Sequence, residues 1–151
     1  AKEMCYVFSG VFRVYYLDPK GNEVTYMFLK EKDLFTETNS YYKGYPSRGS
    51  IKAETTVEAV VFMKSSWDEL RLTIKDWDFA MKRISQDQLM QRLRFQRLLI
   101  DQDATTAYKV LLDKDPTIAL RVPAQHLASY MGITKHSLSR IRKNIASKDK
   151  S

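Results

Sequence analysis

The order of hydrophobic and polar residues divides the chain into three segments with different periods. Up to about Met63 the sequence is rich in aromatic and β-branched residues and alternates in places with period two, as strands do. From about Asp76 to Ile100 apolar residues recur every three or four positions without Gly or Pro, which predicts one long helix. Shorter helical segments follow from about Asp103. The chain is therefore expected to be an α+β protein.

The first segment predicts about five strands. Strands are expected at residues 5–8, 11–17 and 23–29, and the run Asp18-Pro19-Lys20-Gly21-Asn22 predicts a hairpin between the last two. The alternation from Ile51 to Val61 predicts further strands with one wet face, and residues 36–48 are expected to form a polar, Tyr-rich loop or short helix. Because five strands close neither a sandwich nor a barrel, we expect that the first strands are missing from this chain.

Two helices are expected in the middle of the chain. A short helix should begin at residues 65–69 with Ser66 as its N-cap. The long helix that follows is interrupted as a heptad by the polar run of residues 85–88. Its apolar stripe leaves two interpretations open, packing against the strands or pairing with a second copy of the chain. The residues of this stripe are Trp77, Met81, Ile84, Leu89 or Met90, Leu93 and Ile100.

The most informative stretch is "VPAQHLASYMGITKHSLSRIRKNI", which follows a predicted helix at 104–112 and a turn near Asp115-Pro116. It predicts a helix-turn-helix: one helix starts at Pro123-Ala124, Gly132 takes the positive φ of the turn, and Thr134 caps a second helix. The residues expected between the two helices are Leu127, Ala128, Met131, Ile133, Leu138 and Ile141. Opposite them lie Lys135, His136, Ser139, Arg140 and Lys143, which form a basic outward face.

The positive charge of the chain is concentrated in the segment that holds the predicted helix-turn-helix. The chain of 151 residues has an ordinary globular composition and a net charge of +7. Residues 121–151 hold seven Lys and Arg against one acidic residue, whereas residues 1–120 hold 18 against 17. A positive charge concentrated on one helix-turn-helix indicates an acidic partner such as DNA.

Several classes of protein are excluded by composition. No apolar run reaches the roughly 18 residues of a membrane span, and no signal-peptide pattern opens the sequence, so a cytoplasmic protein is expected. Cys5 stands alone, which excludes an internal disulfide, and His126 and His136 both fall outside the strands, which argues against a cupin-type metal enzyme. Without a phosphate loop or a catalytic triad we expect no enzyme, no cofactor and no metal.

The whole chain, and most specifically residues 123–145, resembles the CRP/FNR superfamily of bacterial transcription regulators. The resemblance implies an N-terminal jelly-roll (double-stranded β-helix) sensor domain at residues 1–75, a dimerisation helix at 76–102 and a winged-helix or helix-turn-helix domain at 103–151. It further implies a homodimer on a near-palindromic DNA site, contact with RNA polymerase and a small-molecule effector. The tail after Ile145 is expected to be disordered, which puts the wing in doubt.

The resemblance also implies site residues. Lys135, His136, Ser139 and Arg140 would face base edges in the major groove, Arg140 as a reader of guanine. Thr134, Ser137 and Lys143 would contact phosphates.

The cyclic-nucleotide cassette of that superfamily is matched only in part by "DLFTETNSYYKGYPSRGSIKAET". Glu37 is present, but Thr36 replaces a Gly, and Ser47-Arg48-Gly49 stands where nucleotide-binding members have Arg-Ser-Ala. The effector pocket is therefore assigned to Glu37, Ser47 and Arg48, with an unidentified ligand other than cyclic AMP, because Ser47 cannot pair with a cyclic phosphate as Arg does. A ligand-binding or interaction module that does not bind DNA stays open as the alternative, and DNA affinity distinguishes the two.

Overall fold

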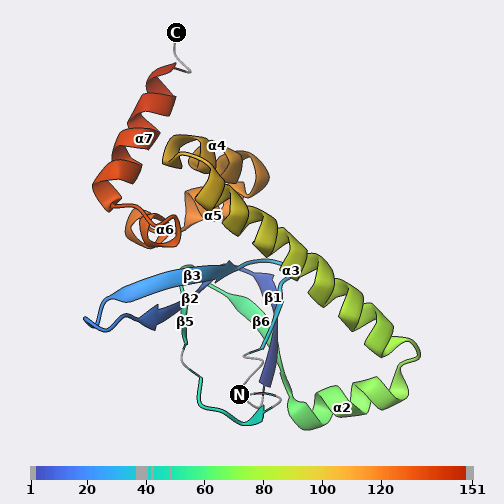
Figure 1. The fold of residues 1–151 in the computed structure, drawn as a ribbon. Helices are drawn as coiled ribbons and strands as arrows, with labels where there is room; N and C mark the ends of the chain where they lie inside the picture. The colour runs from blue at the N-terminus through green and yellow to red at the C-terminus, as the bar shows by residue number, and fades with distance from the viewer. Residues whose placement is uncertain (1–2, 37–40, 42, 48, 149–151) are drawn as a thin grey trace.

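The computed structural model describes residues 3–36, 41, 43–47 and 49–148, which form two small antiparallel sheets, a long helix and a group of shorter helices (Figure 1). The sheets have the strand orders β4-β1-β6 and β3-β2-β5 and share an apolar core around Val7, Val14 and Leu29. We call these strands the β unit. They are β1 (Glu3–Ser9), β2 (Phe12–Leu17), β3 (Glu23–Leu29), β4 (Leu34–Phe35), β5 (Ser50–Ala53) and β6 (Glu58–Met63).

The hairpin between β2 and β3 confirms the turn signal in the sequence. A carboxylate oxygen of Asp18 accepts hydrogen bonds from the backbone N–H groups of Lys20 and Asn22, both at 2.8 Å. Gly21 takes a φ of 84°, as a turn of this kind requires. The division of the segment after Ser50 into two strands, β5 and β6, agrees with the expectation. The described residues hold one strand more than expected, because the two-residue strand β4 gave no periodic signal.

The helices begin directly after β6. They are α2 (Lys64–Thr73), α3 (Trp77–Asp101), α4 (Ala104–Lys114), α5 (Pro116–Arg121), α6 (Ala124–Tyr130) and α7 (Lys135–Lys148). We call α4 to α7 the helical bundle. The prediction of Ser66 as an N-cap is wrong, because α2 starts at Lys64 and its N-cap, Met63, is the last residue of β6. Because β6 passes directly into α2, Ser66 already lies in the first turn of the helix. The buried Trp67 packs against Phe62 and Trp77.

Helix α3 connects α2 to the helical bundle and runs alongside the β unit (Figure 1). The packing interpretation of its apolar stripe is confirmed for two residues. Trp77 and Met81 pack on a cluster formed with Met4, Tyr41 and Trp67, as the packing interpretation requires. The other apolar residues of the stripe, Ile84, Leu89, Met90, Leu93 and Ile100, are exposed, as is Phe79 at 70%.

The C-terminal end of the fold departs from expectation in one respect. Helix α7 continues through Lys148, so the prediction of a disordered tail is wrong for residues 146–148. Ile145 packs against the core of the helical bundle, which stabilises this last turn. No strand follows β6 in the described residues, so the wing implied by the resemblance is not among them. None of the described helices has the length and apolarity that crossing a membrane requires.

Candidate nucleic-acid interface

The turn between α6 and α7 has the hydrogen bonds of a Schellman motif, which ends a helix and reverses the chain. The N–H of Ile133 donates to the carbonyl of Ala128 at 3.0 Å, and that of Gly132 donates to the carbonyl of Ser129 at 3.1 Å. Gly132 has a φ of 68°, in the left-handed region that favours glycine. The predicted role of Gly132 is therefore confirmed.

The start of α7 is fixed by the predicted N-cap. The Thr134 hydroxyl oxygen accepts a hydrogen bond from the backbone N–H of Ser137 at 3.1 Å, which satisfies one of the unpaired donors in the first turn. The same hydroxyl donates to Oγ of Ser137 at 3.0 Å. The Ser137 hydroxyl accepts this hydrogen bond, so its own hydrogen can be donated to an acceptor on a partner molecule.

A buried seam joins the two helices of the motif. Leu127 and Leu138 are fully buried, and Ala128 gives the close approach that a crossing of two helices needs. Met131 and Ile141 complete the seam, and Ile133 packs against it. The apolar residues predicted from spacing are those the structure brings together.

The opposite side of α7 is exposed and basic. We define the basic face as Lys135, His136, Ser139, Arg140 and Lys143, all of which are exposed. Their spacing of three and four residues places them along one side of the helix, as the sequence predicts. Because the seam and the basic face lie on opposite sides, burying the first leaves the second open to a partner.

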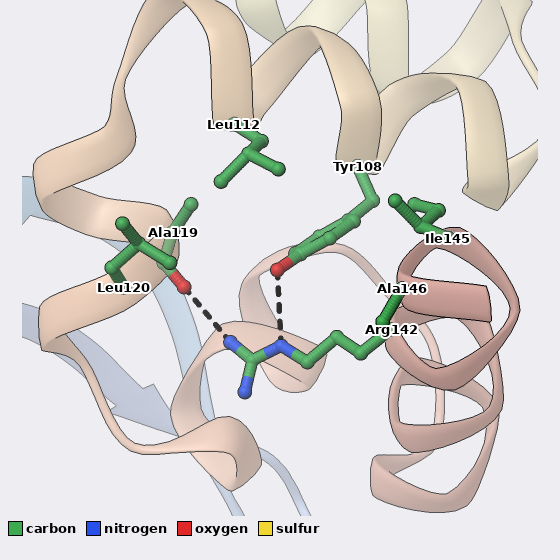
Figure 2. Close-up of a pocket in the computed structure, with 7 residues that line it drawn as sticks. All are labelled: Tyr108, Leu112, Ala119, Leu120, Arg142, Ile145 and Ala146. Carbon is green, nitrogen blue, oxygen red and sulfur yellow. Dashed lines mark hydrogen bonds between the residues drawn. The ribbon is translucent and has the colours of Figure 1, made fainter. Parts of the chain in front are cut away.

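Arg142 is a basic residue of α7 that does not belong to this face. Its Nε donates to the hydroxyl oxygen of Tyr108 at 3.1 Å and its Nη2 donates to the backbone carbonyl of Ala119 at 2.8 Å (Figure 2). These bonds join α7 to α4 and to the last turn of α5, across a pocket of about 350 Å³ that is otherwise mostly apolar. Arg142 was missed in the sequence, although it follows Leu138 by four residues and so adjoins the buried stripe.

The helical bundle rests directly on the β unit. Its core includes Val11, which directly precedes β2, and Phe28 of β3, and Phe95 of α3 packs against the same core. The ring of Tyr130 on α6 meets Phe28 edge-on, with 5.1 Å between centroids. Burial raises the pKa of the Tyr130 phenol well above its usual range. The contact is therefore a packed one rather than a surface touch.

The residues predicted for an effector pocket are mostly outside the described part of the chain, since Glu37 and Arg48 both are. Ser47 is exposed and forms a local turn, in which its hydroxyl donates to the Gly49 carbonyl at 2.9 Å. The Gly49 N–H donates back to the Ser47 hydroxyl at 3.3 Å. The Ser47 hydroxyl is thus engaged within its own turn.

Comparison with known proteins identifies the fold. No family profile matches the chain, and neither does any curated protein. Solved structures match nearly all of it, including the following three. FixK2 from Bradyrhizobium japonicum is 18% identical, with a TM-score of 0.78, and the match covers 98% of this chain and 76% of the FixK2 chain. The c-di-GMP responsive regulator CLP from Xanthomonas campestris is 19% identical, with a TM-score of 0.71, covering 99% and 79%. A CRP-family transcriptional regulator from Thermus thermophilus is 14% identical, with a TM-score of 0.77, covering 98% and 77%.

These matches define the class of the fold. The β unit, the long helix and the C-terminal helix-turn-helix together form the fold of CRP/FNR-type transcription regulators. The resemblance found in the sequence is therefore confirmed at the level of the fold.

Proposed function

We propose that the protein is a sequence-specific DNA-binding transcription regulator that acts as a homodimer. The observation that carries the proposal is the basic face of α7, exposed on a helix whose opposite side is buried in a helix-turn-helix seam. A helix presented in this way fits the major groove, and its positive charge matches the phosphate backbone. The fold supports the same function, because the matched structures are transcription regulators.

The side chains of the basic face divide into two roles. Arg140 would donate two hydrogen bonds to O6 and N7 of a guanine, and Lys135, His136 and Ser139 would contact neighbouring base edges. Lys143 would contact a phosphate, as would Ser137 through its remaining hydroxyl hydrogen. Thr134 would act on the phosphates mainly by holding the first turn of α7, where backbone N–H groups point toward the DNA.

The dimer would form along the exposed side of α3. Phe79, Leu93 and Ile100 are 70%, 48% and 82% exposed. They are separated by fourteen and seven residues, so they lie along one side of the helix and form an exposed apolar stripe. Pairing of this stripe with a second copy would remove it from water and relate two α7 helices by a two-fold axis. A DNA site of near-palindromic sequence follows from that symmetry.

The remaining parts of the proposal concern regulation. Residues 1–75 would form the sensor domain, 76–102 the dimerisation helix and 103–151 the DNA-binding domain. An effector other than cyclic AMP would bind the sensor domain near Glu37, Ser47 and Arg48. The regulator would act in the cytoplasm and contact RNA polymerase, and it would need neither a metal nor a catalytic group.

Selection from a random pool of DNA duplexes tests the function. We expect enrichment of a near-palindrome whose half-sites lie about one helical turn, roughly 34 Å, apart. A protein that enriches no sequence, and binds none of the pool in low salt, would instead be the non-DNA ligand-binding or interaction module.

A further inference from the structure

A buried ionic cluster lies on the face of sheet β3-β2-β5 that meets the helical bundle. Its centre is Arg13 of β2, which is only 1% exposed. The Arg13 Nε donates to Oε1 of Glu54 at 2.7 Å, its Nη2 donates to the carboxylate of Glu23, and its Nη1 donates to the Thr25 hydroxyl at 3.4 Å. Stacking over the ring of Tyr15 completes its surroundings. The partners of Arg13 thus come from strands β2 and β3 and, for Glu54, from the bend after β5.

Glu54 extends this cluster to α6. Its side chain is 4% exposed, and its second carboxylate oxygen, Oε2, lies 2.8 Å from Nδ1 of His126. We define the Glu54 cluster as Arg13, Glu54 and His126. One buried carboxylate therefore contacts a guanidinium in the β unit and an imidazole in the helix-turn-helix.

A second hydrogen bond joins the same two elements nearby. The backbone N–H of Thr25 on β3 donates to the hydroxyl oxygen of Ser129 at 3.0 Å. Ser129 follows His126 by three residues, so both side chains lie on one side of α6, and Figure 1 shows that helix against β3. The side of α6 turned toward the strands thus makes polar contacts through His126 and Ser129 in addition to the apolar contact of Tyr130 with Phe28.

Three further contacts surround this junction. Lys30 forms an ion pair with Asp115 at the N-cap of α5, at 2.7 Å, and Arg121 forms one with Glu31 at 2.6 Å. Tyr130 adds the apolar contact with Phe28. The pair of Glu54 and His126 is more buried than either of these two ion pairs, and a buried charge that loses a partner costs more free energy than an exposed one.

The geometry points to a positioning role for the Glu54 cluster. Helix α7 follows α6 after a turn of only four residues, so whatever fixes α6 on the β unit also fixes the direction of the basic face. We propose that Glu54 and His126 set the position of each α7 relative to α3 and thereby the half-site spacing that the dimer accepts. This inference rests on the proposed DNA-binding function for its consequence, but the contact itself can be tested without DNA.

The first test is amide hydrogen exchange measured by NMR on the complete chain without DNA. In His126→Ala the Thr25 amide should exchange about tenfold faster, because loss of the hydrogen bond to a charged partner lets α6 move away from β3 more often. His126→Asn, whose side-chain amide can donate from nearly the place of Nδ1, should restore slow exchange. The Leu138 amide, which donates to the Thr134 carbonyl at 3.0 Å within the motif, should be unchanged and shows that the bundle is folded.

A matched control is Arg71→Ala, which removes an exposed ion pair with Asp78 that lies between α2 and α3. It should leave the Thr25 amide unchanged. Equal exchange of the Thr25 amide in the wild-type protein and His126→Ala would overturn the inference.

The second test uses duplexes that carry two selected half-sites at the preferred spacing, the same half-sites one base pair closer or farther apart, and a single half-site. The wild-type protein should discriminate among the spacings. His126→Ala should bind the duplexes of all three spacings with similar affinity, which means an affinity about tenfold lower than wild type at the preferred spacing. Its affinity for the single half-site should equal that of the wild-type protein. His126→Asn should recover the discrimination.

The outcomes separate the two proposals. If the wild-type protein binds no duplex, the proposed function fails, while the exchange of Thr25 still decides whether the Glu54 cluster holds α6. If the wild-type protein binds DNA and His126→Ala keeps full discrimination among spacings, the positioning role is wrong and the proposed function stands.

Discussion

Tyr130 of α6 stacks on Phe95 of α3, with 5.3 Å between the ring centroids and 17° between the ring planes. This contact places the first helix of the helix-turn-helix against the helix proposed to carry the dimer interface. Phe28 of β3 meets the same ring edge-on, so three parts of the fold contact one aromatic side chain. The position of the helix-turn-helix is thus determined by packing as well as by ionic contacts.

Tyr130 should make the stability of the protein depend on pH in the alkaline range. Burial raises the pKa of its phenol above the ordinary value of 10.0, so the phenol stays neutral in the folded state while it ionises in the unfolded state. The stabilisation is complete below pH 10 and declines as the pH rises beyond it. In urea unfolding between pH 9 and pH 11, the wild-type protein should therefore lose stability more steeply than Tyr130→Phe. Parallel curves would contradict this prediction.

Asp33 is a side chain whose replacement should stabilise the protein at neutral pH. Burial raises the pKa of its carboxyl above 3.8, despite a hydrogen bond from the Lys30 N–H and the positive charge of Arg92. Because the folded state favours the protonated form, the wild-type protein loses stability as the pH rises through that raised pKa. Asp33→Asn can keep the Lys30 hydrogen bond and should be more stable at pH 7.

The advantage of Asp33→Asn should disappear in acid, where the carboxyl is protonated in both states. Chemical unfolding at pH 7 and near pH 3 measures it. A variant less stable than the wild-type protein at pH 7 would show that the attraction between Asp33 and Arg92 outweighs burial.

Arg142 should contribute to stability and not to base recognition. Arg142→Ala removes hydrogen bonds to the Tyr108 hydroxyl and the Ala119 carbonyl, and we expect a loss of about 2–3 kcal/mol in the free energy of unfolding. Arg140→Ala, two residues earlier on the exposed face, is the matched control and should change stability by less than about 0.5 kcal/mol. Urea unfolding of both variants gives the comparison, and similar stabilities for the two would contradict the assignment.

Leu93 tests the proposed dimer. An Asp at this exposed position of α3 would bring two negative charges into a paired seam, so Leu93→Asp should be monomeric and bind the paired half-sites weakly. Gln91→Asp, at an exposed position of the same helix, is a control that should remain dimeric. Light scattering decides the matter, because a mass of one chain for the wild-type protein would exclude the dimer.

Local signals account for what the sequence predicted well. The Schellman turn at Gly132, the Thr134 cap and the β2–β3 hairpin each depend on residues within a few positions of one another. Contacts across long stretches were not predictable. His126 gave no sign of Glu54, which lies 72 residues earlier in the sequence, and Arg142 looked like a further basic residue of α7.

For the long helix, α3, the sequence predicted the apolar positions but not which of them are buried. Its apolar spacing was readable in the sequence, but one helix carries two apolar faces, and only the folded chain separates Trp77, which packs inward, from Leu93, which is exposed. The start of α2 was missed because β6 passes directly into the helix at Lys64, so that Ser66 lies inside the first turn and is not its N-cap.

Binding titrations of Arg140→Ala and Lys143→Ala test whether α7 contacts bases and phosphates of DNA. Affinity for the selected duplex and for a random duplex is measured by fluorescence anisotropy over a series of salt concentrations. Arg140→Ala should lose about 1–3 kcal/mol on the selected duplex only, whereas Lys143→Ala should weaken both and lower the salt slope by about one. Equal losses on the two duplexes for Arg140→Ala would contradict the base-reading role of α7.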